Sequence, residues 1–357
     1  MYGNEAGIAM YTNSDTVRIT AGTLSMGGGA PVSIQTMWKK PLERNEDLLD
    51  EIIRLKAIGC DIIRFAVPDV KSAEILGEIS KNSPLPLVAD IHFDYKIALL
   101  CMDYKISKIR INPGNIGSDC KVKEVIEKAK DTTTPLRVGI NCGSLTVHLR
   151  KNRDKAAAMI LAAEKEIELF KKYNFSDAVF SLKSSDVETT IIANELFAEK
   201  YRFPLHLGVT EAGPLINGVV KNTAGLLPLL GKNIGATIRI SLSSSPEDEI
   251  IAGKAILFQA GLRNDFINIV SCPKCGRAEF DVHNFLSKVN GKLNQIKKPV
   301  TIAIMGCAVN GPQEAKEADI GITGSGNSVV IFKKGEIIKK TTSNCAEEEF
   351  LREIESL

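Results

Sequence analysis

The segment LPLVADIHFDYKIALLCMDYKISKIRINP (85–113) contains one strand–helix–strand unit. Its two ends, LPLVADIHF (85–93) and KIRINP (108–113), are short runs of apolar and β-branched residues, which are typical of buried strands. The stretch YKIALLCMDY between them is helix-type sequence. Because a helix crosses over between the two strands, this segment predicts two parallel neighbours in one sheet.

Runs of the same kind recur along the first 250 residues, and helix-type sequence separates them. There are eight, at 32–37, 61–67, 85–93, 108–113, 136–143, 178–185, 204–211 and 237–243. Eight strand–helix units predict a closed (β/α)8 TIM barrel, an α/β fold. An open doubly wound sheet is the less favoured alternative, because the glycine cluster at 26–31 precedes the first strand and GITGSGNS (321–328) lacks the dinucleotide-binding spacing.

The length of the chain predicts a second domain. The chain has 357 residues, and a barrel uses about 250. After Leu262 the pattern changes to short strands with tight turns and two helix-type segments, which indicates a small α+β domain. We therefore predict a substrate-binding TIM barrel over 1–262 and a second domain over 263–357.

Composition excludes several classes of protein. Lys plus Arg number 45 and Asp plus Glu 43, so the net charge of +2 argues against a general nucleic-acid binder. No apolar run approaches the roughly 20 residues that span a bilayer. The first residues resemble neither a secretory signal nor a transit peptide, so we expect a cytoplasmic protein without a membrane partner. Eight cysteines in that compartment are more typical of thiols or metal ligands than of disulfides.

Polar side chains gather toward the carboxyl ends of the predicted strands, where barrel enzymes place their active sites. In the run LPLVADIHF, the two-residue period of a strand puts Asp90 and His92 on one side. The candidate residues, in strand order, are Arg64, Asp90, His92, Arg110, Asn112, Arg137, Asn141, Lys183, Thr210, Glu211, Arg239 and Ser241.

Five of these candidates are cations. A single one could be an ordinary salt-bridged strand residue, but five converging on one barrel mouth predict an anionic ligand. Carboxylates among them, Asp90 and Glu211, could pair with the cations, bind hydroxyl groups or move protons. The set predicts a phosphorylated or diphosphorylated substrate that carries hydroxyl groups.

The motif Cys272-Pro-Lys-Cys275 in the second domain has the spacing of a metal or redox site. A third cysteine, Cys307, follows an apolar strand, and Glu314 comes seven residues later. A structural zinc site needs four ligands, usually in two close pairs, and the second pair is missing here. Three thiolates with an oxygen ligand suit an iron–sulfur cluster, which the spacing alone favours only modestly over zinc.

Taken together, SCPKCGR, GCAVNGPQEA and ADIGITG resemble the iron–sulfur domain of the 4-hydroxy-3-methylbut-2-enyl diphosphate synthase family. The barrel motifs IIRFAVPD, ADIHF, KIRINPGN, SLKSSD, HLGVTEAG and IRISLS resemble the catalytic barrel of the same family. The resemblance covers about residues 20 to 340. It implies an oxidoreductase of the non-mevalonate isoprenoid pathway that reductively opens 2-C-methyl-D-erythritol 2,4-cyclodiphosphate.

The resemblance also implies the site. A [4Fe–4S] cluster would be held by Cys272, Cys275 and Cys307, with Glu314 as the replaceable oxygen ligand and a candidate proton donor. The five barrel cations match the positions that bind the diphosphate. The other matching pocket positions are Asp90, His92, Asn112, Asn141, Thr210, Glu211, Ser241 and Asn310. Flavodoxin or ferredoxin would supply electrons to a homodimer.

Two segments depart from the family pattern. Gln313 stands where the family usually has glycine, immediately before Glu314, and the segment Trp38-Lys39-Lys40-Pro41 replaces a threonine-rich one. Two rival functions stay open from the sequence. One is a redox-silent phosphate- or pterin-binding barrel enzyme with a structural zinc domain, and the other is a cluster-dependent regulatory or carrier protein.

Overall fold

The computed structural model describes residues 11–43, 47–92, 94–111, 119–276, 278–307, 315–325 and 327–357. It divides into two compact units, Met1–Arg263 and Asn264–Leu357. The boundary predicted from the sequence lies between residues 262 and 263. No helix in the described ranges is long and apolar enough to cross a membrane.

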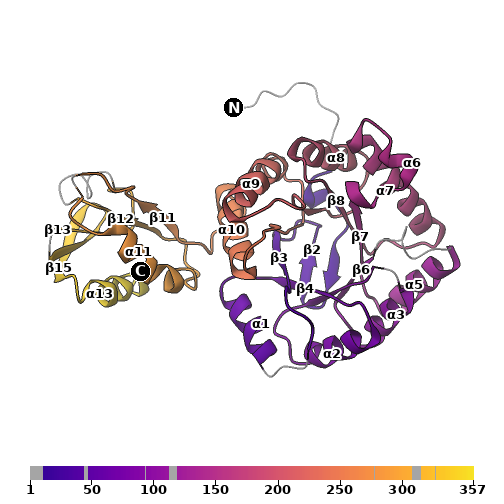
Figure 1. Ribbon diagram of the computed structural model, residues 1–357, viewed down its shortest axis with the longest axis horizontal. Helices are drawn as coiled ribbons and strands as arrows, with labels where there is room; N and C mark the ends of the chain where they lie inside the picture. The colour runs from indigo at the N-terminus through magenta and orange to yellow at the C-terminus, as the bar shows by residue number, and fades with distance from the viewer. Residues whose placement is uncertain are drawn as a thin grey trace. The chain divides into compact units, whose positions relative to one another are not determined.

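The first unit is the predicted TIM barrel, which the structure confirms (Figure 1). Its strands all pair in parallel, and β10 lies between β9 and β3. A parallel bridge between Phe180 and Leu205 joins β8 to the chain that enters β9, which closes the ring. The strands are β3 (Ser33–Met37), β4 (Ile62–Ala66), β5 (Leu87–Asp90), β6 (Lys108–Ile111), β7 (Leu136–Asn141), β8 (Ala178–Lys183), β9 (His206–Leu207) and β10 (Thr237–Ile238).

Helices surround this ring, and many begin at a polar capping residue. The side chains of Asp69, Asp154 and Asp186 each accept a hydrogen bond from a backbone N–H in the first turn of the helix that follows. Such caps satisfy donors that a helix start leaves free and stabilise it by about 1 kcal/mol. The helices are α1 (Asp47–Ala57), α2 (Val70–Ser80), α3 (Tyr95–Asp103), α5 (Asp119–Asp131), α6 (Val147–Arg150), α7 (Lys155–Lys172), α8 (Val187–Lys200), α9 (Leu215–Gly231) and α10 (Pro246–Gln259).

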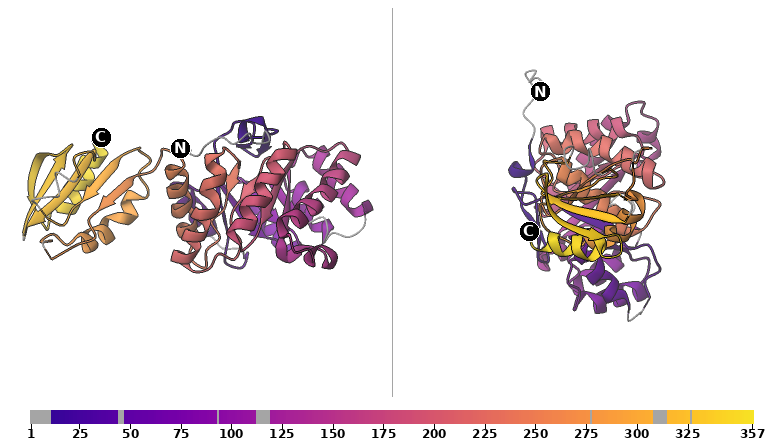
Figure 2. Two further views of the ribbon diagram at one scale, coloured as in Figure 1. Left: turned by 90° about the horizontal axis from the view of Figure 1, so that it is seen from above. Right: turned by 90° about the vertical axis from the view of Figure 1, so that its left-hand side faces the viewer.

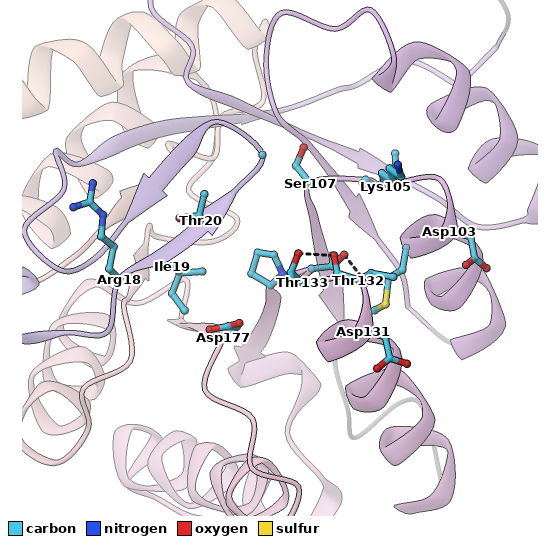
Figure 3. Close-up of a pocket in the computed structure, with 15 residues that line it drawn as sticks. Arg18, Ile19, Thr20, Asp103, Lys105, Ser107, Asp131, Thr132, Thr133 and Asp177 are labelled. Atoms are coloured by element: carbon cyan, nitrogen blue, oxygen red, sulfur yellow. Dashed lines mark hydrogen bonds between the residues drawn. The ribbon is translucent and has the colours of Figure 1, made fainter.

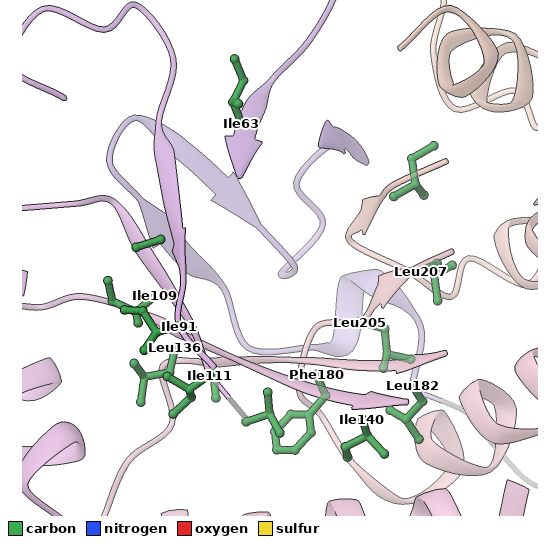
Figure 4. Close-up of a cluster of buried hydrophobic side chains, with 14 of the residues drawn as sticks. Ile63, Ile91, Ile109, Ile111, Leu136, Ile140, Phe180, Leu182, Leu205 and Leu207 are labelled. Carbon is green, nitrogen blue, oxygen red and sulfur yellow. The ribbon is translucent and has the colours of Figure 1, made fainter. Parts of the chain in front are cut away.

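The two faces of each barrel strand have different chemistry. On β6, Ile109 and Ile111 belong to the apolar core that packs against the helices, together with residues such as Phe180 and Leu182 of β8 (Figure 4). Because side chains alternate along a strand, the intervening Lys108, Arg110 and their equivalents face the barrel interior. The interior is therefore polar and charged, whereas the outer face of the strands is apolar.

A short hairpin that the sequence did not predict closes the amino end of the barrel. Its strands, β1 (Ile19–Ala21) and β2 (Leu24–Met26), pair antiparallel. Apolar side chains of both strands pack with barrel residues, so the hairpin forms a floor under the interior (Figure 2). The cluster comprises Ile19, Ala21, Met26, Ile62, Val88, Val179 and Ala236.

The second unit is an α+β domain, as predicted. Its sheet has the order β11-β12-β13-β14-β15, parallel over the first three strands and antiparallel over the last three. Phe285 of α11 and Phe350 of α13 pack edge to face inside its core. The elements are β11 (Asn268–Ser271), α11 (Val282–Leu293), β12 (Thr301–Ile304), β13 (Ile320–Ser325), β14 (Ser328–Lys333), β15 (Glu336–Thr342) and α13 (Ala346–Glu355).

Candidate functional site

The five predicted barrel cations converge inside the barrel. Arg64, Arg110, Arg137, Lys183 and Arg239 come from β4, β6, β7 and β8 and from the residue after β10. These cations are close enough to lower one another's pKa. Burial has the largest effect on Arg137, and the positive charges of Arg64 and Arg110 then lower its pKa further, to well below the ordinary value. Burial and then Arg137 and Arg239 do the same to the pKa of Lys183.

Asp90 is the counter-ion for two of these cations. Its Oδ1 accepts a hydrogen bond from Arg110 Nη1 at 2.9 Å. Its Oδ2 forms an ion pair with Arg64 Nη2 at 2.8 Å and lies 3.9 Å from His92 Nε2. Burial alone would raise the pKa of Asp90, but the positive charges of Arg64 and Arg110 outweigh it and lower the pKa below its ordinary value. Asp90 is therefore ionised and fixes the directions of two guanidinium groups.

Glu249 of α10 provides the second buried carboxylate, and the sequence analysis missed it. Its carboxylate accepts from Arg239 at 3.1 Å and from the Thr36 hydroxyl at 2.8 Å, and Lys39 Nζ lies 2.9 Å away. It lies on a helix outside the barrel, so reading strand ends could not find it. Its only sequence signal is an acidic residue in a helix whose start follows strand eight.

Positive charge exceeds negative charge inside the barrel. Within the described ranges, neither Arg137 nor Lys183 has a carboxylate within salt-bridge distance, although both are more than nine-tenths buried. Arg137 also has two nitrogen atoms, Nε and Nη1, that are buried without a hydrogen-bond partner. Buried cations without counter-ions are costly, so this arrangement favours a bound multivalent anion.

Glycines make room for these long side chains. A Cβ on Gly139 would lie 2.9 Å from both Nε and Nη2 of Arg110, and a Cβ on Gly208 would lie 2.6 Å from Lys183 Nζ. At both distances a methyl group would force the end of the contacted side chain to shift. Glycine at these two positions therefore leaves the space that the side chains of Arg110 and Lys183 occupy.

Gly139→Ala is expected to raise KM for an anionic substrate about tenfold or more. The added methyl group would displace the Arg110 guanidinium from Asp90, and one charge-assisted hydrogen bond is worth about 1.5–3 kcal/mol. Gly143→Ala is the control, because a Cβ there meets nothing within 4 Å. Steady-state kinetics on both variants checks the result, and equal KM values would contradict it.

The other predicted barrel residues lie at the carboxyl ends of the strands. Asn141 is the last residue of β7, and His92, Thr210 and Ser241 follow β5, β9 and β10. Glu211 is exposed, and its backbone adopts a φ of +51°. Asn112, Asn310, Gln313 and Glu314 lie outside the described residues.

The segment 38–41, which differs in sequence from the family pattern, makes defined contacts in the barrel. Trp38 stacks on Phe65 with ring centroids 5.7 Å apart, so it belongs to the apolar core. Lys39 donates to the Leu242 carbonyl at 2.8 Å and also contacts the Ser244 carbonyl, besides its pairing with Glu249. This segment therefore adds a cation beside Arg239.

Two of the cysteines lie just beyond the carboxyl ends of adjacent strands in the sheet of the second unit. β11 and β12 are parallel neighbours, and Cys272 N donates to the Ile304 carbonyl at 3.0 Å. Cys272 directly follows β11, and Cys307 comes three residues after β12, so both leave the carboxyl ends of adjacent strands. The Gly306 carbonyl accepts from Glu279 N and Phe280 N at 2.9 and 3.1 Å, which ties the Cys-x-x-Cys segment to the loop of Cys307.

The surroundings of Cys272 fit a cluster ligand. Lys274, at a φ of +66°, donates its backbone N–H to Cys272 Sγ at 3.4 Å. A Cβ on Gly306 would lie 3.4 Å from this sulfur and 2.8 Å from Ala278 Cβ, so glycine leaves room beside the thiol. Cys275 follows three residues after Cys272 in the same segment, so the chain offers three soft donors, which is the number that suits an iron–sulfur cluster.

Zinc fits this arrangement less well. Four ligands must surround a single zinc ion, whereas each thiolate of a cluster binds a different iron. In the part of the chain that the structure describes, no three His, Cys, Asp or Glu side chains converge on a position where one ion could bind, and Glu314 lies outside the described residues. The preference for a cluster over zinc therefore rests on the number and spacing of the cysteines.

A separate cavity of about 810 Å³ lies at the opposite end of the barrel (Figure 3). Its lining includes Ser107, Pro135 and Asp177, which immediately precede β6, β7 and β8. Active sites of TIM barrels lie at the carboxyl ends of the strands. This cavity is therefore not the candidate active site.

Comparisons with known proteins agree with both units. A family model described as GcpE TIM-barrel domain matches residues 16–254, and one described as GcpE protein C-terminal domain matches residues 268–356. A Treponema denticola protein named 4-hydroxy-3-methylbut-2-en-1-yl diphosphate synthase (flavodoxin) is 49% identical, covering 94% of this chain and 95% of that protein. A Treponema pallidum protein of the same name is 46% identical, covering 91% of this chain and 84% of that protein.

Proposed function

Because the chain belongs to the GcpE family, we propose that it is an oxidoreductase that converts 2-C-methyl-D-erythritol 2,4-cyclodiphosphate to 4-hydroxy-3-methylbut-2-enyl diphosphate in isoprenoid biosynthesis. The observation that carries this proposal is the buried excess of cations inside the barrel, combined with Cys272 and Cys307 beyond the carboxyl ends of adjacent strands in the second unit. The names of the relatives favour this function over the redox-silent barrel with a zinc domain.

The reaction consumes two electrons and one proton, and it leaves the freed diphosphate oxygen with a negative charge. The bond between the tertiary carbon and a diphosphate oxygen breaks, so the ring opens, and the hydroxyl group at the neighbouring carbon leaves as water. Both electrons form the π bond of the new carbon–carbon double bond. The proton is needed to release the hydroxyl group as water. An external reductant is therefore required, which the redox-silent alternative does not need.

The barrel residues bind and orient the substrate. Arg137 and Lys183 supply buried charge without counter-ions, and the charge that develops on the leaving diphosphate oxygen would be stabilised by such preorganised cations. Arg64 and Arg110 are directed by Asp90, and Arg239 is directed by Glu249. Asn141, Thr210 and Ser241 at the strand ends would donate hydrogen bonds to the substrate.

We assign the [4Fe–4S] cluster to Cys272, Cys275 and Cys307, with Glu314 completing the ligand set through oxygen. When bound, such a cluster supplies single electrons and a Lewis-acidic iron. The relatives' name includes flavodoxin, which supports flavodoxin over ferredoxin as the donor. Glu211, His92, Asn112 and Asn310 complete the proposed site, with Glu211 in a proton-handling role.

A homodimer and a cytoplasmic location also belong to this proposal, on the strength of the family resemblance. Sedimentation of the purified holoenzyme tests the first. A mass of one chain at micromolar concentration would remove the dimer from the proposal.

The enzyme activity has a direct test. Anaerobically purified, cluster-loaded protein with a chemical reductant is expected to convert the cyclodiphosphate to the linear allylic diphosphate, with no product when the reductant is omitted. Product formation is followed by chromatography. A colourless protein that contains zinc would contradict the proposal, and Glu314→Ala without effect on function would favour a carrier or regulatory protein.

A further inference from the structure

Lys108 is a buried amine that the proposed chemistry does not use. It begins β6 at the floor of the barrel interior, and its side chain has no solvent exposure. Its Nζ lies 3.4 Å from Sδ of Met26, in the hairpin that closes the floor. An ammonium has three donors and a thioether is a weak acceptor. Among the described residues, most of the hydrogen-bonding capacity of this amine is therefore unused.

The charges that act on Lys108 are positive. Burial, followed by the charges of Arg137 and Arg64, lowers the pKa of Lys108 to about 7. The two carboxylates of the interior are already paired with arginines. The titratable and charged groups that face this interior from the surrounding strands and from α10 are Arg64, Asp90, Arg110, Arg137, Lys183, His206, Arg239 and Glu249.

Neutral polar groups on the other barrel strands also lack partners. Both polar atoms of the Gln35 amide, Oγ of Ser181 and Nε2 of His206 are buried without a hydrogen-bond partner in the described structure. Burial and the charges of Lys183, Arg137 and Lys108 lower the pKa of His206 well below its ordinary value, so this ring is neutral. The interior below the predicted cations is therefore polar, and it lacks negative charge.

We propose that Lys108 is a further residue of the anion site and that binding of a diphosphate is coupled to uptake of a proton by its amine. This inference rests on the proposed function for the identity of the anion. The positive charges of Arg137 and Arg64 disfavour the protonated form of Lys108. A diphosphate bound to these two arginines would offset their charge and attract the protonated amine. The charged amine would then complete the neutralisation from below.

The coupling has a defined sign. In the free protein Lys108 loses its proton as the pH rises through about 7. In the complex the anion raises that pKa, so the favourable contribution is complete below pH 7 and is lost as the pH rises above it. Linkage then predicts that the affinity for the anion falls by up to about tenfold per pH unit above neutrality.

Titration calorimetry with inorganic pyrophosphate tests this on the full-length protein. Measurements at pH 8 in two buffers that differ in ionisation enthalpy count the protons taken up. Wild-type protein is expected to take up about one proton more than Lys108→Met, because the free amine is mostly neutral at that pH. The protonation of pyrophosphate itself contributes equally to both proteins. Lys105→Met, an exposed lysine before the same strand, is the control and should match the wild type.

Lys108→Arg separates charge from structure. Arginine stays charged at all these pH values, so this variant should bind pyrophosphate without the extra proton and without the loss of affinity above pH 7. Equal proton uptake by wild type and Lys108→Met, or a wild-type affinity that does not fall above pH 7, would overturn the proposal. Because pyrophosphate binding needs no reductant, proton uptake in a protein without synthase activity would refute the proposed function alone.

Discussion

Cys307→Ser is expected to reduce turnover of the cyclodiphosphate by more than about 100-fold. Altering only an outer partner of a metal ligand typically costs 10–100-fold, and this substitution removes one of three soft ligands. The loop that carries Cys307 is tied to the Cys-x-x-Cys segment through the Gly306 carbonyl, so the fold of the unit should survive. Iron content, visible absorption and turnover of anaerobically reconstituted protein measure the effect.

Cys345→Ser is the matched control. Cys345 is exposed at the start of α13 in the same unit, and its side chain makes no capping hydrogen bond there. This variant should keep its iron and its activity. Full iron content in Cys307→Ser, or an equal loss in both variants, would contradict the assignment of Cys307 as a ligand.

Asp90→Asn is expected to lower the free energy of unfolding by about 3–5 kcal/mol. The substitution leaves Arg64 and Arg110 buried without their shared counter-ion, and removing one partner of a buried ion pair costs about that amount. Pyrophosphate should restore part of the loss, because it binds the folded state and supplies negative charge. Denaturant unfolding with and without pyrophosphate measures both effects.

The pH dependence gives Asp90→Asn a second readout. The pKa of Asp90 is lowered in the folded protein, so its contribution to stability is complete above the unfolded pKa of about 3.9. It is lost as the pH falls through the lower folded value. Asp90→Asn should therefore show a weaker loss of stability on acidification than wild type. Asp177→Asn, at an exposed position, is the control, and identical acid profiles for all three proteins would refute the role of Asp90.

Strand and helix order could be predicted because each barrel strand has a strong local signal. The alternation in KIRINP places Ile109 and Arg110 on opposite faces of the strand, and in the structure Ile109 lies in the apolar core whereas Arg110 pairs with Asp90. The cysteine spacing could likewise be used before the fold was known. These features depend on neighbours in the sequence, which periodicity detects.

Features that depend on distant contacts could not be predicted. The hairpin β1–β2 has strands of three residues, too short for a periodic signal, and it is stabilised by barrel residues far along the chain. Glu249 lies more than 200 residues from Lys39 and Thr36, its partners besides Arg239. His206 gave no signal beyond an isolated histidine, yet it is completely buried in the barrel interior against Thr237.

The hairpin floor also affects how fast an anion arrives. With apolar side chains covering the amino ends of the strands, the field of the interior cations meets water chiefly at the other end of the barrel. A low-dielectric wall focuses such a field and accelerates the diffusion of oppositely charged molecules toward the opening. The association rate of the diphosphate should therefore fall steeply as ionic strength rises and the Debye length shortens.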